Sequence, residues 1–136
     1  MRTFVLHLQD ARGYDRVEGV ESFVGSDESG SFGLMAGHER FMTSLMFGLA
    51  RFRLGGEPWE YLALPGALVY YVDDQLFLST RRYFRDPDYR RISGQLMDRL
   101  AAEERDLAAI QESLHRLEEE IQKRLWELGR GREAGL

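Results

Sequence analysis

Apolar and polar positions alternate in short stretches through the first 85 residues, with the two-residue period of a half-buried β-strand. Turn signals of glycine, proline or aspartate separate these stretches at a spacing typical of an antiparallel sandwich or barrel. From this pattern we predict strands at residues 3–8, 17–24, 31–35, 42–46, 49–54, 59–64, 67–72 and 75–79. The expected turns between them lie at Arg12-Gly13, residues 25–30, Gly55-Gly56, Pro65-Gly66 and Asp73-Asp74.

The last 50 residues follow a helical pattern instead. Between residues 88 and 128 the chain has one glycine, Gly94, and no proline, and it is rich in residues that favour helices. Asp88 can begin the helical region, and the glycines at 129 and 131 can end it. A first apolar stripe contains Ile92, Leu96, Met97 and Leu100, and a second, at roughly heptad spacing, contains Leu107, Ile110, Leu114, Leu117, Ile121, Leu125 and Leu128.

Two arrangements of this region remain open, because residues 103–106 between the stripes are polar but contain no helix breaker. One is a tight helical hairpin that bends there, and the other is a single helix of about 40 residues. We therefore predict an α+β protein, with an antiparallel β-sandwich over residues 1–86 and an α-helical domain over residues 87–136. The second stripe must pack against a hairpin partner, the sandwich or another protein, which points to an interaction protein.

Composition mainly excludes functions. The 136 residues contain no cysteine, so disulfides, thiolate metal sites and cysteine nucleophiles are excluded. The formal net charge is −5, which disfavours a nucleic-acid partner held by phosphate neutralisation. No apolar stretch has the length of a membrane span or the form of a signal peptide, so we expect a soluble protein that meets a membrane only from its surface.

The sequence contains no group of residues with the spacing of a catalytic or metal-binding site. The histidines at 7, 38 and 115 lack metal-ligand spacing. The stretch GSDESGSFG at 25–33 lacks the Gly-Lys-Ser/Thr ending of a phosphate loop, and its two acids would repel phosphate. Asp73 and Asp74 are expected to face water in a turn. The one basic cluster, formed by Arg81, Arg82, Arg85, Arg90 and Arg91 among aromatic residues, could bind a nucleotide or form a solvated junction.

Two sequence segments, in this order and followed by the helical region, resemble the epsilon subunits of F-type ATP synthases. The first runs through residues 20–25, GSFGLMAGH at 30–38 and MTSL at 42–45. The second is YLALPGALVYYV at 61–72 followed by QLFLST at 75–80. The family commonly has proline before the Gly-His pair and Ala-Pro after it, where this chain has Ala36, Glu39 and Arg40. Residues 78–82 and 125–129 look closest to the alternate (N-type) branch.

The resemblance implies a sandwich of about ten strands followed by a C-terminal helical region. It also implies a non-catalytic place in the rotor, on the cytoplasmic side of the cell membrane, where the subunit couples ion flow to rotation. Carried over residue by residue, Ser31 and Phe32 would approach the c-ring, while His38, Phe41 and Met42 would face the gamma subunit. Contact with the membrane would be indirect, through the complex, and in many members the C-terminal helices can inhibit ATP hydrolysis.

Some members bind ATP through an Ile/Leu-Asp-x-x-Arg-Ala motif, of which Asp88 and Arg91 match here while Pro87 and Ile92 do not. We therefore expect no cofactor, and keep Asp88 and Arg91 as candidate nucleotide ligands. Two alternatives from other classes remain: a nucleotide-binding regulatory module using the basic cluster, and a coiled-coil adaptor that associates with itself through residues 107–128.

Overall fold

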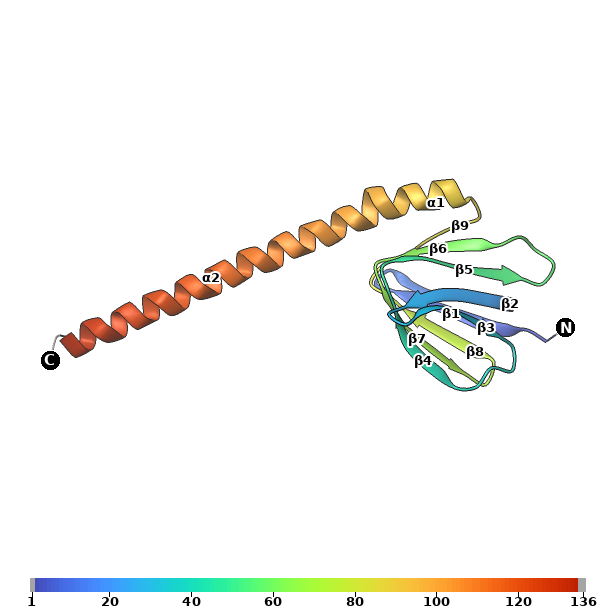
Figure 1. The fold of residues 1–136 in the computed structure, drawn as a ribbon, viewed down its shortest axis with the longest axis horizontal. Helices are drawn as coiled ribbons and strands as arrows, with labels where there is room; N and C mark the ends of the chain where they lie inside the picture. Colours follow the sequence, from blue (N-terminus) through green and yellow to red (C-terminus); the bar gives the residue numbers. More distant parts are fainter. Residues whose placement is uncertain (1, 135–136) are drawn as a thin grey trace. The chain divides into compact units, whose positions relative to one another are not determined.

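The computed structural model describes residues 2–134, and within them nine β-strands precede the helical segments (Figure 1). The predicted fold class, a sandwich followed by helix, is confirmed, with nine strands where about ten were expected. All eight stretches predicted from alternation are strands, and β9 is an addition. The strands are β1 Phe4–Asp10, β2 Gly13–Asp27, β3 Gly30–Met35, β4 Phe41–Leu45, β5 Gly48–Leu54, β6 Glu60–Leu64, β7 Ala67–Val72, β8 Gln75–Ser79 and β9 Phe84–Asp86.

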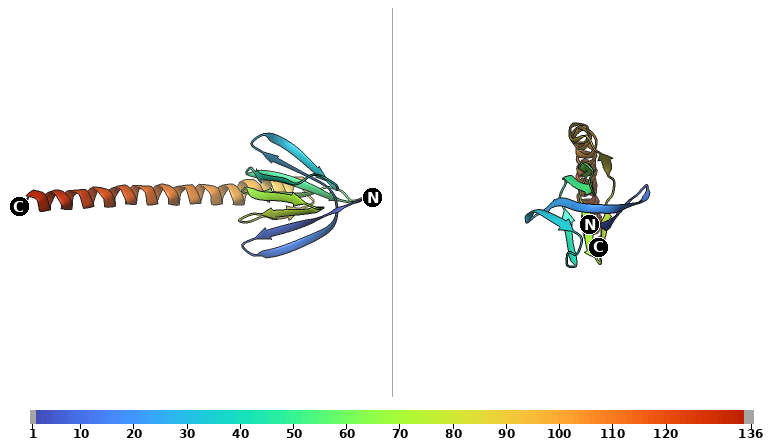
Figure 2. Two further views of the ribbon diagram at one scale, coloured as in Figure 1. Left: turned by 90° about the horizontal axis from the view of Figure 1, so that it is seen from below. Right: turned by 90° about the vertical axis from the view of Figure 1, so that its right-hand side faces the viewer.

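One long strand, β2, belongs to both layers of the sandwich. Hydrogen bonds connect the strands in the order β4-β7-β8-β1-β2-β5-β6-β9, and β3 also pairs with β2. The first half of β2 pairs with β1, and its second half lies between β3 and β5. The register shifts around Gly19, whose φ of +72° suits a β-bulge that bends the strand. In Figure 2 the hairpins that β2 makes with β1 and with β3 extend to opposite sides of the sandwich.

The core lies between the layers and follows the alternation seen in the sequence. Phe4, Phe23, Phe52 and Tyr71 are its largest fully buried side chains, and leucines from β1, β3, β6 and β8 fill the space between them. The edge of the Phe4 ring meets Tyr71 with 5.6 Å between centroids. Burial of this apolar surface is the main force that holds the two layers together.

A short helical segment covers the outer face of β6. It consists of α1, Tyr89–Gln95, and a π-helical turn, η1, Leu96–Leu100. Ile92 and Leu100 are fully buried against Ala63, which points away from the main core. The wider turn of η1 keeps residues four apart on one line, so Ile92, Leu96 and Leu100 share a face, whereas Met97 from the same predicted stripe is 63% exposed. The compact unit built around the sandwich therefore extends to Ala101.

The final helix, α2, runs without interruption from Ala101 to Ala134. Residues 103–106, where a hairpin would have bent, are helical, so the single long helix is the arrangement found. Every described side chain from Glu104 to Gly129 is exposed. None of the helices in the described part of the chain is long and apolar enough to cross a membrane.

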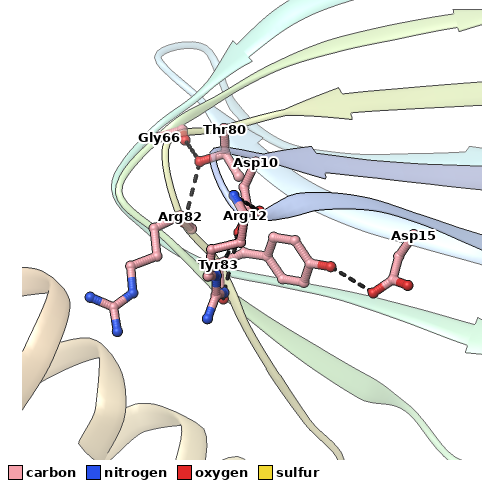
Figure 3. Close-up of polar contacts among 7 residues, drawn as sticks. All are labelled: Asp10, Arg12, Asp15, Gly66, Thr80, Arg82 and Tyr83. Atoms are coloured by element: carbon pink, nitrogen blue, oxygen red, sulfur yellow. Dashed lines mark hydrogen bonds and ion pairs between the residues drawn. The ribbon is translucent and has the colours of Figure 1, made fainter.

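Side chains at the β1–β2 turn hold the segment that leads from β8 to β9 (Figure 3). The Arg12 guanidinium donates to the Tyr83 carbonyl oxygen over 2.7 Å, and the Tyr83 hydroxyl donates to Asp15 over 2.9 Å. The Thr80 hydroxyl donates to the Gly66 carbonyl oxygen over 2.6 Å. These bonds fix the chain just before β9.

Candidate docking surfaces

The predicted gamma-contact residues surround the loop between β3 and β4. In this loop Gly37 has a φ of +84°, a left-handed conformation that glycine adopts at little cost. The backbone N–H of His38 donates to the Met35 carbonyl oxygen over 3.2 Å. The edge of the exposed His38 ring meets Phe41 and Tyr71, with 5.7 Å and 5.8 Å between ring centroids. The structure thus brings His38 and Phe41 together.

Asp74, in the turn between β7 and β8, fastens this loop to the sandwich. Its carboxylate accepts from the Gly37 N–H over 2.7 Å, from the Tyr71 hydroxyl over 2.8 Å and from the Arg2 guanidinium over 2.7 Å. Donation from the Gly37 N–H, followed by Tyr71, lowers the pKa of Asp74 below its ordinary value. Burial, together with the neighbouring carboxylate, raises the pKa of Tyr71 to about 12. We expected a water-facing turn acid, and instead Asp74 positions the Gly-His loop.

The two predicted contact sets meet at a pair of phenylalanines. Phe32 and Phe41 both pack against the core, and their ring centroids lie 5.1 Å apart. Phe32 points inward on β3, whereas the neighbouring Ser31 is exposed and its hydroxyl lies 3.2 Å from that of Ser26. A substitution of either ring is therefore expected to alter the packing at both predicted contact surfaces.

Met42 points away from Phe41 and begins a row of side chains on the outer face of the sandwich. We call this the outer apolar row: Met42 on β4, Tyr70 on β7, Phe77 on β8 and His7 on β1, which are cross-strand neighbours in register. Met42 is 70% exposed and Phe77 42% exposed. Phe77 stacks on His7 with 4.5 Å between centroids. Leu68 and Tyr14, also more than half exposed, border the row.

His7 is the one buried polar residue of this face. Its Nε2 atom lies 2.6 Å from the Gln75 amide oxygen, and its Nδ1 atom contacts the Tyr14 hydroxyl. Both ring nitrogens therefore have partners, which keeps the ring flat against Phe77. Sequence reasoning missed most of this surface, although β7 carried a signal: its ALVYYV sequence is apolar on both faces, while only one face meets the core.

A second exposed surface lies at the turns near Ser31. The N–H of Met46 donates to the Ser26 carbonyl oxygen over 3.0 Å, which places the β4–β5 turn beside the β2–β3 hairpin. Met46 and Phe47 are 55% and 40% exposed. The Asp27 carboxylate accepts from the Ser29 and Thr43 hydroxyls, which lower its pKa. The result is an apolar end of the sandwich next to an ionised carboxylate.

The candidate nucleotide ligands already have partners within the chain. Asp88 is the N-cap of α1, and its carboxylate accepts from the N–H groups of Arg90 and Arg91. Arg91 forms a two-point ion pair with Asp86 at 2.6 Å and 3.0 Å, which lowers the pKa of Asp86. In the same basic cluster, Arg85 forms a second such pair, with Glu60. Among residues 2–134 no group of three or more histidine, aspartate or glutamate side chains could hold a metal ion.

These features define a class of protein: a two-layer β-sandwich with exposed apolar surfaces, followed by a long amphipathic helix. The sequence profile of the ATP synthase delta/epsilon chain β-sandwich domain matches residues 10–85. The chain belongs to the ATP synthase delta/epsilon chain family.

Comparison with individual proteins agrees with this family. The chain is 38% identical over 52 residues to "ATP synthase epsilon chain 2" of Cereibacter sphaeroides, which is 38% of this chain and 36% of that protein. The match thus spans only about a third of that relative. The fold resembles a chain in the Euglena gracilis mitochondrial ATP synthase (OSCP/F1/c-ring), with a TM-score of 0.55 and 17% identity over 61% of this chain and 53% of that one. It also resembles a chain in the Tetrahymena thermophila mitochondrial ATP synthase central stalk and c-ring, with a TM-score of 0.51 and 12% identity over 61% and 66% of the two chains.

Proposed function

We propose that this protein is the epsilon subunit of an F-type ATP synthase, a non-catalytic part of the central stalk on the cytoplasmic side of the cell membrane. It couples ion flow through the membrane sector to rotation, and its sandwich docks on the gamma subunit and the c-ring. The observation that carries the proposal is the family's sandwich domain combined with apolar surface left exposed on it.

The gamma subunit is proposed to contact His38, Phe41 and Met42. The outer apolar row supports this assignment, because it extends from Met42 across four neighbouring strands. An exposed apolar surface of this kind is typical of a protein interface. The Asp74 network supports it as well, since it holds the His38 loop in one conformation before a partner binds.

The c-ring is proposed to contact Ser31 and Phe32. The adjoining turn residues Met46 and Phe47 extend that surface, and their exposure supports docking at this end of the sandwich. We further propose that α2 restrains ATP hydrolysis, and that the complex belongs to the alternate (N-type) branch. The branch assignment rests on the resemblance of residues 78–82 and 125–129.

A nucleotide-binding role for Asp88 and Arg91 is the less favoured candidate. The helix cap formed by Asp88 and the Asp86–Arg91 ion pair would both have to be given up to free these groups for a ligand. We therefore propose a subunit that works without a cofactor.

Co-purification with the gamma subunit and c-ring of the same complex tests the proposal. We expect the full chain to bind both, and a Met42→Glu variant to lose gamma while remaining folded, because a charge would be buried on the row. Met97→Glu is the matched control: Met97 is 63% exposed, compared with 70% for Met42, and lies on η1 away from the row. Failure of the unaltered chain to bind gamma, or equal loss in both variants, would refute the docking assignment.

A further inference from the structure

Arg51 is an exposed arginine of β5 whose guanidinium has no counterion within the chain. It lies opposite Val24 of β2 and Tyr61 of β6. The neighbouring Phe52 is fully buried, so Arg51 and Arg53 both point to the outer face of this layer. In the described part of the chain the Arg51 guanidinium forms no hydrogen bond or ion pair. Its N–H groups are therefore available to a ligand.

The indole ring of Trp59 orients this guanidinium. Trp59 directly precedes β6, and the Cζ atoms of Arg51 and Arg53 lie 4.7 Å and 5.0 Å from the centroid of its ring. Such a contact engages the flat face of a guanidinium and leaves the N–H groups on its edge able to donate. The nearby acids serve the other arginine: Glu21 pairs with Arg53 at 3.4 Å, and Glu57 lines a hollow with that same pair. The positive charge of Arg51 is therefore held in place without being neutralised.

A hollow of about 260 Å³ adjoins Arg51 on the outer face of the sheet. Arg51 is the one charged residue among the described residues that line it. Hydroxyl groups come from Ser26 and Ser31, whose oxygens lie 3.2 Å apart. Two more come from Tyr61 and Tyr89, whose rings meet edge to face with 5.4 Å between centroids. A single cation surrounded by hydroxyl groups is an arrangement that suits an anion.

The charge at the hollow favours a carboxylate over a phosphate group. A carboxylate has one negative charge and two oxygens, which match the paired N–H groups of a single guanidinium. A phosphate monoester carries a charge of about −1.5 to −2 at neutral pH. It would need a second cation, and Arg53 already pairs with Glu21.

The surroundings of the hollow favour an acidic side chain of another polypeptide over a small free acid. A single ion pair at a solvent-exposed site contributes little by itself. The two elements that border the hollow, α1 and β3, also carry the exposed side chains of Tyr89 and Met35, which are 57% and 60% exposed. A polypeptide can cover this apolar surface while it inserts a carboxylate. Because Ser31 at the rim belongs to the proposed c-ring contact, such a segment would lie beside that surface.

We propose that Arg51 and the hollow beside it bind a glutamate or aspartate side chain, flanked by apolar residues, on a segment of another protein. The edge of the guanidinium donates two N–H groups to the carboxylate, while Trp59 supports its face. This site goes beyond the proposed function, because neither the gamma contact nor the c-ring contact includes Arg51.

Two capped peptides of about eight residues test the proposal on the full chain, one with a glutamate between two leucines and its twin with glutamine there. Fluorescence of Trp59 in a Trp126→Phe background reports binding, because Arg51 lies over that ring, and calorimetry of the unaltered chain checks the affinities. We expect saturable binding of the glutamate peptide at millimolar concentrations, and binding of the glutamine peptide at least about tenfold weaker. Sodium acetate and inorganic phosphate should each bind at least about tenfold more weakly than the glutamate peptide.

Four results would overturn the proposal. Equal binding of the two peptides, or of neither, would show that Arg51 takes no carboxylate. Acetate that binds as tightly as the glutamate peptide would make the ligand a free acid and not a polypeptide. Phosphate that binds more tightly than the glutamate peptide would make it a different anion.

Variants assign the effect to the Arg51 guanidinium. Arg51→Gln should weaken binding of the glutamate peptide about tenfold and change binding of the glutamine peptide less than about twofold. Arg51→Lys keeps the charge but not the paired N–H groups, and should recover only part of the lost affinity. Arg40→Gln is the matched control, since it removes the same charge from the exposed β3–β4 loop, and should change either affinity less than about twofold. Equal losses in Arg51→Gln and Arg40→Gln would contradict the assignment. Because neither the gamma subunit nor the c-ring is present, failure here leaves their proposed docking untouched.

Discussion

Tyr71→Phe removes the hydroxyl that binds Asp74, the residue that fastens the His38 loop to the sandwich. The ring is fully buried, so phenylalanine keeps its packing against Phe4, while the contacts of the hydroxyl with the Asp74 carboxylate at 2.8 Å and the Met35 carbonyl oxygen at 3.1 Å are lost. A hydrogen bond to a charged group contributes about 1.5–3 kcal/mol, and one between neutral groups about 0.5–1.5 kcal/mol. Because the Asp74 side chain is 24% exposed, water screens part of the interaction, and we expect a cost of about 1–2 kcal/mol.

Tyr70→Phe is the matched control, one residue away on the opposite face of β7. Tyr70 belongs to the outer apolar row, and its hydroxyl has no hydrogen-bond partner among the described residues. The control should change the free energy of unfolding by less than about 0.5 kcal/mol. Urea unfolding is best followed by tryptophan fluorescence in a Trp126→Phe background, so that Trp59 alone reports on the sandwich.

The pH dependence of the free energy of unfolding tests the Tyr71–Asp74 hydrogen bond independently. The pKa of Asp74 is lowered in the folded protein, so its ionised form stabilises the fold above its unfolded pKa of about 3.9. This stabilisation is lost as the pH falls through the lower folded pKa. The difference in the free energy of unfolding between the native protein and Tyr71→Phe should therefore be largest at neutral pH and shrink below about pH 4.

Two results would refute this reasoning about the Asp74 network. The first is a cost of Tyr70→Phe equal to that of Tyr71→Phe, which would show that loss of any tyrosine hydroxyl on β7 has the same effect. The second is a Tyr71→Phe cost that stays constant down to pH 3 or so, which would mean that the Asp74 carboxylate is not the acceptor that matters.

Three further predictions concern the turn after β7 and the start of the helical region. Ile92→Ala should cost about 2–4 kcal/mol in urea unfolding, because the side chain is fully buried in a small cluster; a cost below about 0.5 kcal/mol would contradict that packing. Asp73→Gly should stabilise the sandwich by about 0.5–1 kcal/mol, since φ is +48° there, and a lower melting temperature would argue against the turn assignment. Asp88→Ala should cost about 1 kcal/mol as a lost helix cap, and millimolar ATP should leave the melting temperature of both proteins unchanged; a rise only in the native protein would favour nucleotide binding instead.

Strands with one buried face could be predicted from alternation, and those that depend on distant partners could not. The pattern predicted β1 and β8 to within two residues at each end. It missed β9, a three-residue strand without internal periodicity that exists because Phe84 and Arg85 pair with β6. It shortened β2, since the first four residues of that strand are exposed on both faces and include Asp15 and Arg16.

In the helical region and at the site, too, features set by nearby residues could be predicted from the sequence, and features set by contacts distant in the sequence could not. Helix formation after Pro87 follows from composition, whereas the choice between a hairpin and one helix depends on which surface covers the second stripe. Asp74 could be predicted as a turn residue, but its role as the anchor of Gly37 joins residues 37 apart. No local pattern reports a contact of that separation. The outer apolar row was visible only as excess apolar character in β7.

The parallel pairing of β1 with β8 has a consequence for how the protein acquires its structure. Every one of its five paired positions joins residues about 70 apart, from Val5 with Gln75 to Gln9 with Ser79. Closing so long a loop is entropically costly, and topologies dominated by such contacts fold in milliseconds to seconds. Helix α2 contains only local hydrogen bonds and forms in about a microsecond. Helix formation in this part of the chain is therefore expected to precede closure of the sandwich.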